Sequence, residues 1–161
     1  MKFIKEVIPY IVIIVVVTMI RTFLVTPVWV DGVSMNPTLD DRDILILNKY
    51  DTEYERFEIV VLNFMDEKLI KRVIGLPGDT IHYKDNNLYI NGEIVEEDFL
   101  HKDTPDFSLK DIGYEVVPEG YYFVVGDNRT DSLDSRTFGF VKKDDIDGTV
   151  KVSLWPFGKV N

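Results

Sequence analysis

The sequence predicts a mostly β protein, with one N-terminal transmembrane helix followed by an antiparallel β-sheet domain that carries a small inserted β subdomain. Residues 7–25 form a nearly unbroken apolar run, close to the roughly 20 residues that a spanning helix needs. After Pro27 the apolar residues come in short β-branched runs separated by polar segments, as in strands. Within 79–95, Asn91-Gly92 is typical of a two-residue hairpin turn.

The composition narrows the class of protein. A chain of 161 residues with 45% apolar content is long enough for one domain with a core and is too apolar to be disordered. It contains no cysteine and two histidines, which argues against thiol chemistry, a histidine triad and a metal site. Its net charge of −10 repels nucleic acid. We expect a monomer without a metal, a cofactor or a nucleic-acid partner.

The apolar run 7–25 is interpreted as an uncleaved membrane anchor. Lys2 and Lys5 precede it, so the positive-inside rule places residues 1–6 in the cytoplasm and residues 26–161 outside the membrane. A cleavable signal peptide is the main alternative, but no small-residue site of the Ala-x-Ala type follows the run. A buried core helix is a third alternative, disfavoured because the run lacks a polar face.

The domain that follows is predicted strand by strand. Seven β-branched and aromatic runs predict strands, over 28–33, 44–48, 57–64, 69–75, 121–125, 138–141 and 149–154. The segment 79–95 is predicted to form small hairpins, and the first of them is expected to turn at Asn86-Asn87. The acidic segment 96–119 has little periodicity and is interpreted as a loosely ordered excursion. We therefore place the inserted subdomain at 80–118.

Ser34 follows the predicted strand 28–33. Gly32 removes a side chain just before it, so that backbone or a substrate can approach there. Pro37 ends the strand and fixes a turn directly after it. The pattern predicts a hydroxyl at the end of a strand, facing a gap, although a serine in a turn is common and is not by itself a nucleophile.

Lys71 and Arg72 lie inside the apolar run 69–75, and strand alternation sends them to opposite faces. Burial beside Ile70 and Val73 would lower the pKa of Lys71 from its ordinary value of about 10.4. An amine with such a pKa can act as a general base near neutral pH. The alternative interpretation is a lysine that protects an edge strand from aggregation.

A dense polar loop spans residues 126–136, between two apolar strands. Ser132, Asp134 and Arg136 would share one face if this segment were extended, so that a hydroxyl, a carboxylate and a guanidinium form a connected set. Arginine–carboxylate pairs are suited to holding a loop rigid. A calcium loop is disfavoured because no bidentate glutamate closes it.

Taken in order, these three segments resemble the type I signal peptidases, membrane-anchored serine proteases that remove signal peptides from exported proteins. The matching motifs are Ser34-Met35-x-Pro37-Thr38-Leu39, the sequence KRVIGLPGD over 71–79, and GDNRxxSxDSRxxG over 126–139. The resemblance covers nearly the whole chain and is weakest over 96–119. It implies a signal-peptidase/LexA-like fold, a Ser–Lys dyad, and two partners: preproteins that carry signal peptides, and the lipid bilayer.

The resemblance also implies roles for particular residues. Ser34 would be the nucleophile and Lys71 the general base. The supporting residues would be Ser132, which orients the lysine amine, and the two ion pairs Asp134–Arg136 and Asp127–Arg72. Shallow apolar pockets for small residues at positions −1 and −3 of the substrate would be lined by Val28, Val30, Leu39 and Ile70, with the substrate extended beside strand 28–33.

One position departs from the pattern of some family members. Gly32 stands where they have a serine whose hydroxyl helps to bind the oxyanion, so the Ser34 backbone N–H is expected to take that role. Single-span members similar to those of Gram-positive bacteria also have glycine there, which makes this a difference of subtype. The sequence Trp155-Pro156-Phe157 has two interpretations, contact with the membrane interface or a cap on the β core.

Two rival functions are weighed against this prediction. The first is a non-catalytic anchored β domain that binds exported peptides, which replacement of Ser34 or Lys71 would have favoured. The second is a self-cleaving repressor-type peptidase, which would need a DNA-binding N-terminal domain and an internal Ala-Gly site. The chain contains no alanine, so it offers neither that site nor an Ala-x-Ala site to itself.

Overall fold

The computed structural model describes residues 2–23, 25–99 and 103–160, without the side chains of 2–5, 20–23 and 25. Lys2 and Lys5, which set the predicted orientation, therefore have side chains outside the described residues. The helices are α1 (Lys2–Phe23) and α2 (Ser135–Phe138), with the 3-10 turns η1 (Leu109–Ile112) and η2 (Lys143–Asp145). The strands are β1 (Val25–Trp29), β2 (Ile44–Asn48), β3 (Ile59–Phe64), β4 (Glu67–Gly75), β5 (Ile81–Lys84), β6 (Asn87–Ile90), β7 (Glu93–Val95), β8 (Phe107–Ser108), β9 (Tyr121–Val125), β10 (Val141–Lys142), β11 (Ile146–Trp155) and β12 (Phe157–Lys159).

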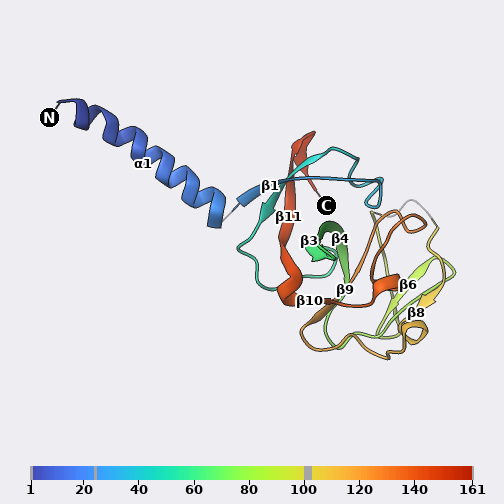
Figure 1. Cartoon of the computed structure of the whole chain (residues 1–161). Coiled ribbons are helices and arrows are strands. Elements are labelled where there is room, and N and C mark those ends of the chain that lie inside the picture. Colours follow the sequence, from blue (N-terminus) through green and yellow to red (C-terminus); the bar gives the residue numbers. More distant parts are fainter. Residues whose placement is uncertain (1, 24, 100–102, 161) are drawn as a thin grey trace.

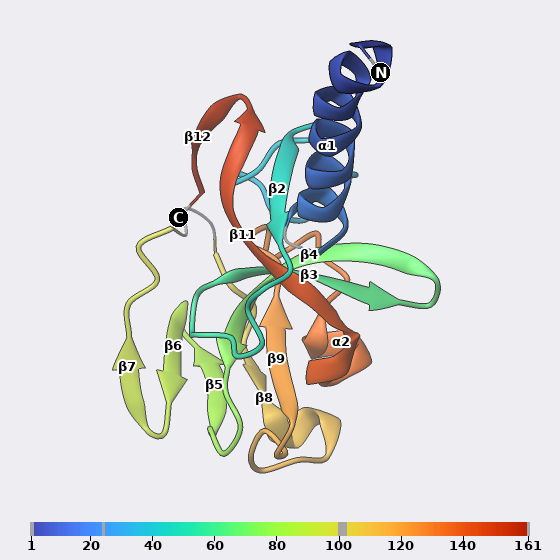
Figure 2. The same ribbon diagram turned by 90° about the vertical axis from the view of Figure 1, so that its left-hand side faces the viewer.

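The strands form two sheets, and the mostly antiparallel β architecture is confirmed. The larger sheet has eight strands in the order β1-β2-β11-β3-β4-β9-β10, with β12 paired to β11, and the smaller one has the order β7-β6-β5-β8. Figure 2 shows the smaller sheet beside β9, below the end where α1 joins the larger sheet. Strand β4 lies between β3 and β9, and β9 pairs with it from Arg72 to Gly75.

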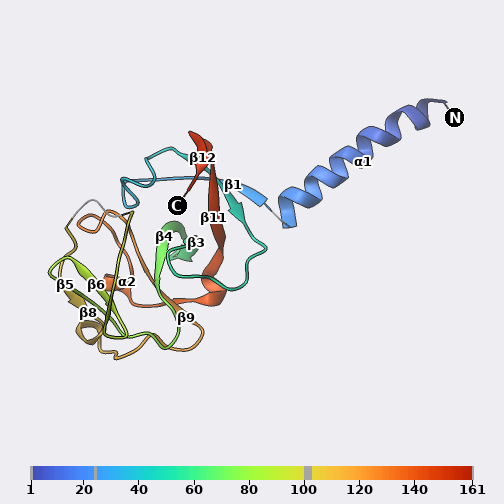
Figure 3. The ribbon, with the colours of Figure 1, turned by 180° about the vertical axis from the view of Figure 1, so that it is seen from behind.

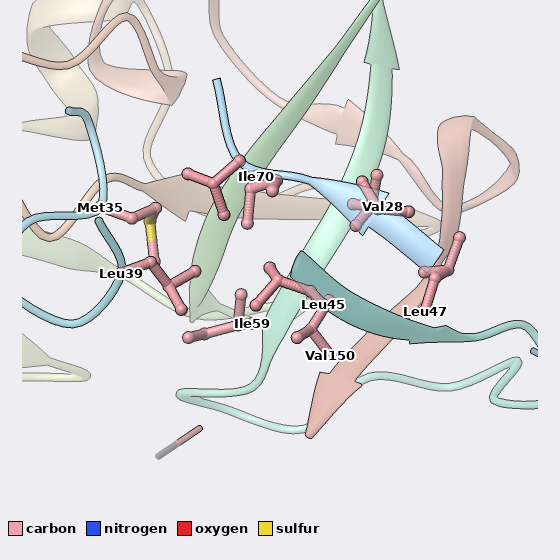
Figure 4. Close-up of a cluster of buried hydrophobic side chains, with 10 residues drawn as sticks. Val28, Met35, Leu39, Leu45, Leu47, Ile59, Ile70 and Val150 are labelled. Atoms are coloured by element: carbon pink, nitrogen blue, oxygen red, sulfur yellow. The ribbon is translucent and has the colours of Figure 1, made fainter. Parts of the chain in front are cut away.

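The hydrophobic core lies on both faces of the larger sheet. In β3, Ile59 and Val61 pack into one cluster of buried side chains, whereas Val60 and Leu62 pack into another. This division follows from the alternation of side chains along a strand, and it explains why β3 reads as a continuous apolar run. Figure 4 shows the first cluster, which gathers side chains from β1, β2, β3, β4 and β11 with those from the turn after β1.

The smaller sheet depends on two tight turns. Asn91 and Gly92 both have positive φ and connect β6 to β7, as expected for a two-residue hairpin. The preceding hairpin turns at Asp85-Asn86, one residue earlier than predicted, because Lys84 pairs with Asn87.

The segment 96–119 is more ordered than predicted over the residues that the structure describes. Ser108 and Asp111 form a reciprocal capping box around η1. Leu109 and Val117 are each 1% exposed and pack into the core cluster of the smaller sheet. Apolar side chains spaced too irregularly to give a periodicity therefore still anchor this segment.

Two predicted strands differ from the structure. The strand predicted over 28–33 is instead β1, which ends at Trp29, because the chain then turns at Gly32 with φ +93°. The predicted strand 138–141 is divided between α2 and β10. The Asp134 carboxylate caps α2, and Gly139, with φ +86°, ends it.

Helix α1 extends away from both sheets (Figures 1 and 3). Apart from Val7, its described large apolar side chains are exposed, from Val16 at 47% to Tyr10 at 69%. The buried core helix considered as a third alternative is therefore wrong. Among the described residues, no helix meets both the length and the apolar character required to cross a membrane.

Candidate active site

Ser34 and Lys71 come together from two separate parts of the fold. Ser34 begins the turn that follows β1, and Lys71 lies within β4, where it pairs with Val60. Lys71 Nζ lies 2.7 Å from Ser34 Oγ, within hydrogen-bond distance. Lys71 is 2% exposed, so the interpretation of Lys71 as a lysine that protects an exposed strand edge is wrong.

The environment of Lys71 favours the neutral amine. Its side chain lies inside the fold, and the residue is 2% exposed. Burial lowers the pKa of Lys71 from 10.5 to about 8, while the negative charges of Asp134 and Asp127 act in the opposite direction. Desolvation outweighs the two carboxylates because an ammonium loses hydration when it leaves water.

The loop after β9 holds the turn that carries Ser34. The backbone N–H of Asn128 donates to the Ser34 carbonyl oxygen at 3.0 Å, and its side-chain amide donates to the Val33 carbonyl oxygen at 3.1 Å. At Gly126, a Cβ would lie 2.2 Å from Ser132 Oγ and 2.5 Å from the Ser34 carbonyl oxygen. Only glycine allows this close approach.

Sequence reasoning gave no role to Gly126 or Asn128. Both follow directly after the buried strand β9 and open the polar motif. A glycine between a buried strand and a dense polar loop is the feature that would have identified a close backbone approach.

Arg72 and Asp127 form a buried ion pair beside the site. The guanidinium contacts both carboxylate oxygens, at 2.9 and 2.6 Å, and the two side chains are 2% and 0% exposed. Asp127 also accepts a hydrogen bond of 2.5 Å from the Thr38 hydroxyl. The pair therefore fastens β4 both to the loop after β9 and to the turn that carries Ser34.

Asp134 and Arg136 are also paired, at 2.9 and 2.8 Å. The extended face predicted for Ser132, Asp134 and Arg136 does not exist, because Asp134 caps α2 and so the segment turns into a helix. The Asp134 carboxylate also accepts a hydrogen bond from the backbone N–H of Gly126. Among the described residues, Ser132 Oγ is buried without any hydrogen-bond partner, Lys71 included.

A small cavity of about 40 Å³ lies beside Ser34 and Lys71. Three of the four predicted pocket residues line it, namely Val28, Val30 and Ile70, together with Met35, which sequence reasoning missed. Leu39 does not line it, although Figure 4 shows Leu39 packed in the same apolar cluster. A larger groove of about 750 Å³ continues from this cavity along β1 and shares Val28, Trp29, Asp31, Lys68 and Leu69 with it.

The Trp155-Pro156-Phe157 turn connects β11 to β12. Trp155 is 71% exposed and Phe157 is 84% exposed, so the interpretation of this turn as a cap on the β core is wrong. Ile44 pairs with Trp155 on one side and with Trp29, 64% exposed, on the other. Trp29 and Trp155 therefore flank β2 at the same level, and Phe157 follows on β12 beyond β11.

In the described part of the chain, no group of three or more histidine, cysteine, aspartate or glutamate side chains is arranged to hold a metal ion. What the site does bring together is a hydroxyl and a desolvated amine. A nucleophile and an adjacent base are two of the components that an acyl-transfer reaction needs.

Comparison with known proteins supports the same class of protein. Residues 3–155 match the family model described as signal peptidase, peptidase S26. Signal peptidase I of Bacillus amyloliquefaciens is 45% identical over 157 residues, covering 91% of this chain and 85% of that protein. Signal peptidase I V of Bacillus subtilis (strain 168) is 50% identical over 135 residues, covering 75% and 80%.

A solved structure gives a consistent result. The crystal structure of a signal peptidase I from Enterococcus faecalis V583 matches with a TM-score of 0.56 and 41% identity, covering 60% of this chain and 96% of that chain. The family model and these relatives agree over most of the sequence. The chain therefore belongs to the peptidase S26 family and is a signal peptidase I, a serine peptidase of the hydrolase class.

Proposed function

We propose that this signal peptidase cleaves exported preproteins with a catalytic dyad, in which Ser34 is the nucleophile and Lys71 is the general base. The observation that carries the proposal is the distance of 2.7 Å between Lys71 Nζ and Ser34 Oγ, with the amine buried. A pKa of about 8 for Lys71 supports it, since a base is most effective when its pKa lies near the working pH.

In the first step, neutral Lys71 accepts the proton of the Ser34 hydroxyl as Oγ attacks the scissile carbonyl. Lys71 then gives that proton to the leaving amine of the mature protein, and an acyl-enzyme remains. In the second step, Lys71 takes a proton from water as the water attacks the ester, and the proton returns to Ser34 when the signal peptide leaves. The same amine therefore serves both half-reactions.

The backbone and the neighbouring hydroxyl complete the proposed mechanism. The Ser34 N–H is proposed to donate to the oxyanion, in agreement with Gly32 having no side chain for that role. Ser132 is proposed to orient the Lys71 amine. Its hydroxyl is buried and without a partner in the described structure, and a buried hydroxyl without a hydrogen bond is costly unless a functional state supplies one.

Small residues at substrate positions −1 and −3 are proposed to bind over Val28, Val30, Leu39 and Ile70. The cavity beside Ser34 is small, about 40 Å³, and apolar side chains form much of its lining. Such a site would favour a small apolar side chain of the substrate. The rest of the substrate is proposed to lie extended along β1, in the larger groove.

We further propose that residues 7–25 anchor the enzyme in the cytoplasmic membrane, with residues 1–6 in the cytoplasm and residues 26–161 outside it as a monomeric catalytic domain. The exposed apolar side chains of α1 support this proposal, because water disfavours such a surface and lipid does not. The exposed Trp29, Trp155 and Phe157 would contact the membrane interface, where aromatic side chains are favoured. The inserted subdomain is assigned to residues 80–118.

The proposal is tested with a preprotein that has an Ala-x-Ala site, in detergent or lipid. We expect the wild type to cut after the small residue at −1, and Ser34→Ala and Lys71→Ala to leave the substrate intact. Lys71→Arg should be equally inactive, because a guanidinium stays protonated. If the folded wild type does not cut, a non-catalytic peptide-binding domain becomes the better explanation; equal cutting by all the variants would eliminate the dyad.

A further inference from the structure

Two buried arginines lie next to the segments that carry Ser34 and Lys71, and both contact one short stretch between β7 and β8 of the smaller sheet. Arg72 is the residue after Lys71, and Arg129 is the residue after Asn128, whose N–H bonds the Ser34 carbonyl. The stretch 97–99 follows β7 and supplies a partner to each arginine. It belongs to the acidic segment 96–119, which the resemblance matched least.

The first contact is an ion pair between Glu97 and Arg129. The guanidinium donates to both carboxylate oxygens, at 3.1 and 2.6 Å, and the two side chains are 5% and 0% exposed. Arg129 also donates to the Gly126 carbonyl oxygen at 3.1 Å and to the Thr104 hydroxyl at 3.3 Å. A planar guanidinium bonded on several sides fixes the backbone that it contacts.

The consequence reaches the nucleophile through the backbone. Arg129 holds the loop at Gly126, and the same loop bonds the Ser34 carbonyl through the N–H of Asn128. Gly126 lies so close to Ser34 that a Cβ on it would be 2.5 Å from the Ser34 carbonyl oxygen. A shift of the loop would therefore shift the turn that sets the position of Ser34 Oγ.

The second contact is between Phe99 and Arg72. The Arg72 guanidinium carbon lies 3.8 Å from the centre of the Phe99 ring, and the same ring packs edge-on against Phe57 at 5.3 Å. The Arg72 guanidinium donates to the Phe57 carbonyl oxygen and to Asp127. Phe99 therefore covers the ion pair that fastens the strand carrying Lys71.

We propose that Glu97 and Phe99 are positioning residues, through which the smaller-sheet region clamps the two arginines and thereby holds Ser34 Oγ at hydrogen-bond distance from Lys71 Nζ. The clamp deepens the proposed function, because it rests on Ser34 and Lys71 being the reacting pair. Neither residue contacts the reacting atoms. Each acts through an arginine, and Asp98 between them is exposed and takes no part.

The clamp predicts a loss in turnover without a loss in substrate binding. In the full chain in detergent, Glu97→Gln should lower kcat for preprotein cleavage about 10- to 100-fold, the cost of a misplacement of about 1 Å in a reacting pair. KM should stay within about twofold. Phe99→Leu should lower kcat about tenfold at most, because the ring face contributes less than the ion pair. Asp98→Asn removes one carboxylate from the same stretch and should leave both constants unchanged.

A second measurement follows Lys71 itself and needs no substrate. The side-chain ¹³Cε and ¹⁵Nζ NMR signals of Lys71, assigned with Lys71→Arg, report whether the amine still faces Ser34. We expect these signals to shift in Glu97→Gln and in Phe99→Leu, and to coincide with the wild type in Asp98→Asn.

The outcomes separate the clamp from the proposed function. A wild type that does not process the preprotein refutes the proposed function, while the Lys71 signals still decide whether the clamp positions the pair. Glu97→Gln with lower thermal stability but unchanged Lys71 signals would reduce the contact to a structural role and overturn the clamp. A raised KM with unchanged kcat would also overturn it, because the stretch would then bind substrate.

Discussion

The dependence of cleavage on pH is the sharpest consequence of the buried amine. Burial gives Lys71 a pKa of about 8 in place of 10.5. The neutral fraction is then about one half at pH 8 and about one tenth at pH 7, whereas an ordinary lysine would be about 0.03% neutral at pH 7. Burial of this one side chain therefore raises the fraction of Lys71 that is neutral about 300-fold at pH 7.

We expect kcat/KM to rise about tenfold per pH unit below pH 7 and to level off above about pH 9, with a midpoint near 8. The assay is cleavage of a preprotein whose cleavage region carries no titrating side chain, followed between pH 5 and 10. Thermal unfolding at each pH is the control, since loss of fold would imitate the acid limb. A profile that is flat from pH 5 to 9, or a midpoint near 10.5, would refute the assignment of Lys71 as a titrating base.

A carboxylate near Lys71 allows the direction of the electrostatic effect on its pKa to be tested. Asp134 raises the pKa of Lys71 because its negative charge favours the ammonium. Asp134→Asn should therefore lower the pKa of Lys71 and move the acid limb to lower pH, even if the variant is less active. A shift to higher pH would mean that the electrostatic reasoning is wrong.

Three further predictions concern stability and packing. Lys71→Met should be inactive, yet its free energy of unfolding in urea at pH 7 should be higher than that of the wild type by up to about 3 kcal/mol. The reason is that the pKa of Lys71 is lower in the folded than in the unfolded protein, so the buried ammonium destabilises the folded state, and this cost disappears only as the pH rises through about 10.5. Gly126→Ala should lower kcat at least about tenfold, because its Cβ would lie 2.5 Å from the Ser34 carbonyl oxygen. Asp127→Asn should lower the free energy of unfolding by about 3–5 kcal/mol, because it leaves Arg72 buried with a neutral partner.

Each of these has a matched control or a contradicting result. For Lys71→Met, the stability advantage over the wild type should shrink between pH 7 and 10.5. An advantage that stays constant would contradict the link between the lowered pKa of Lys71 and the free energy of unfolding. Gly158→Ala is the control for Gly126→Ala, since a Cβ at residue 158 meets nothing within 4 Å. An unchanged kcat in Gly126→Ala would show that the loop can move to accept a Cβ without displacing Ser34. Asp147→Asn removes a more exposed ion pair with Lys68 and should lower the free energy of unfolding by less than about 1 kcal/mol. An equally small loss in Asp127→Asn would show that burial does not strengthen the contribution of the Arg72–Asp127 pair to stability.

The positions of most strands in the sequence could be predicted well, and those of the hairpin turns less well. The runs 44–48 and 121–125 coincide with β2 and β9, because short β-branched runs carry their own conformational preference. The boundaries at 28–33 and 138–141 were wrong because a positive-φ glycine and a helix-capping carboxylate decide them. Both act through local backbone geometry that a hydrophobic pattern does not contain.

Within the candidate site, the resemblance predicted two ion pairs correctly but did not predict how the backbone holds them. The ion pairs Arg72–Asp127 and Asp134–Arg136 exist, yet the second is built on a helix cap and not on an extended face. Glu97 and Phe99 lie in a segment with no motif and no periodicity. Nothing in their sequence context indicates that they meet Arg129 and Arg72.

By itself, the sequence determined the class of fold and predicted Ser34 and Lys71 as the reacting pair, because β-branched runs and short motifs are local features. Only the tertiary structure decided which atoms meet. The distance of 2.7 Å between Lys71 Nζ and Ser34 Oγ joins residues 37 positions apart, and the pKa of Lys71 depends on burial by the whole sheet. Desolvation and contact are properties of the packed chain, and no window of sequence contains them.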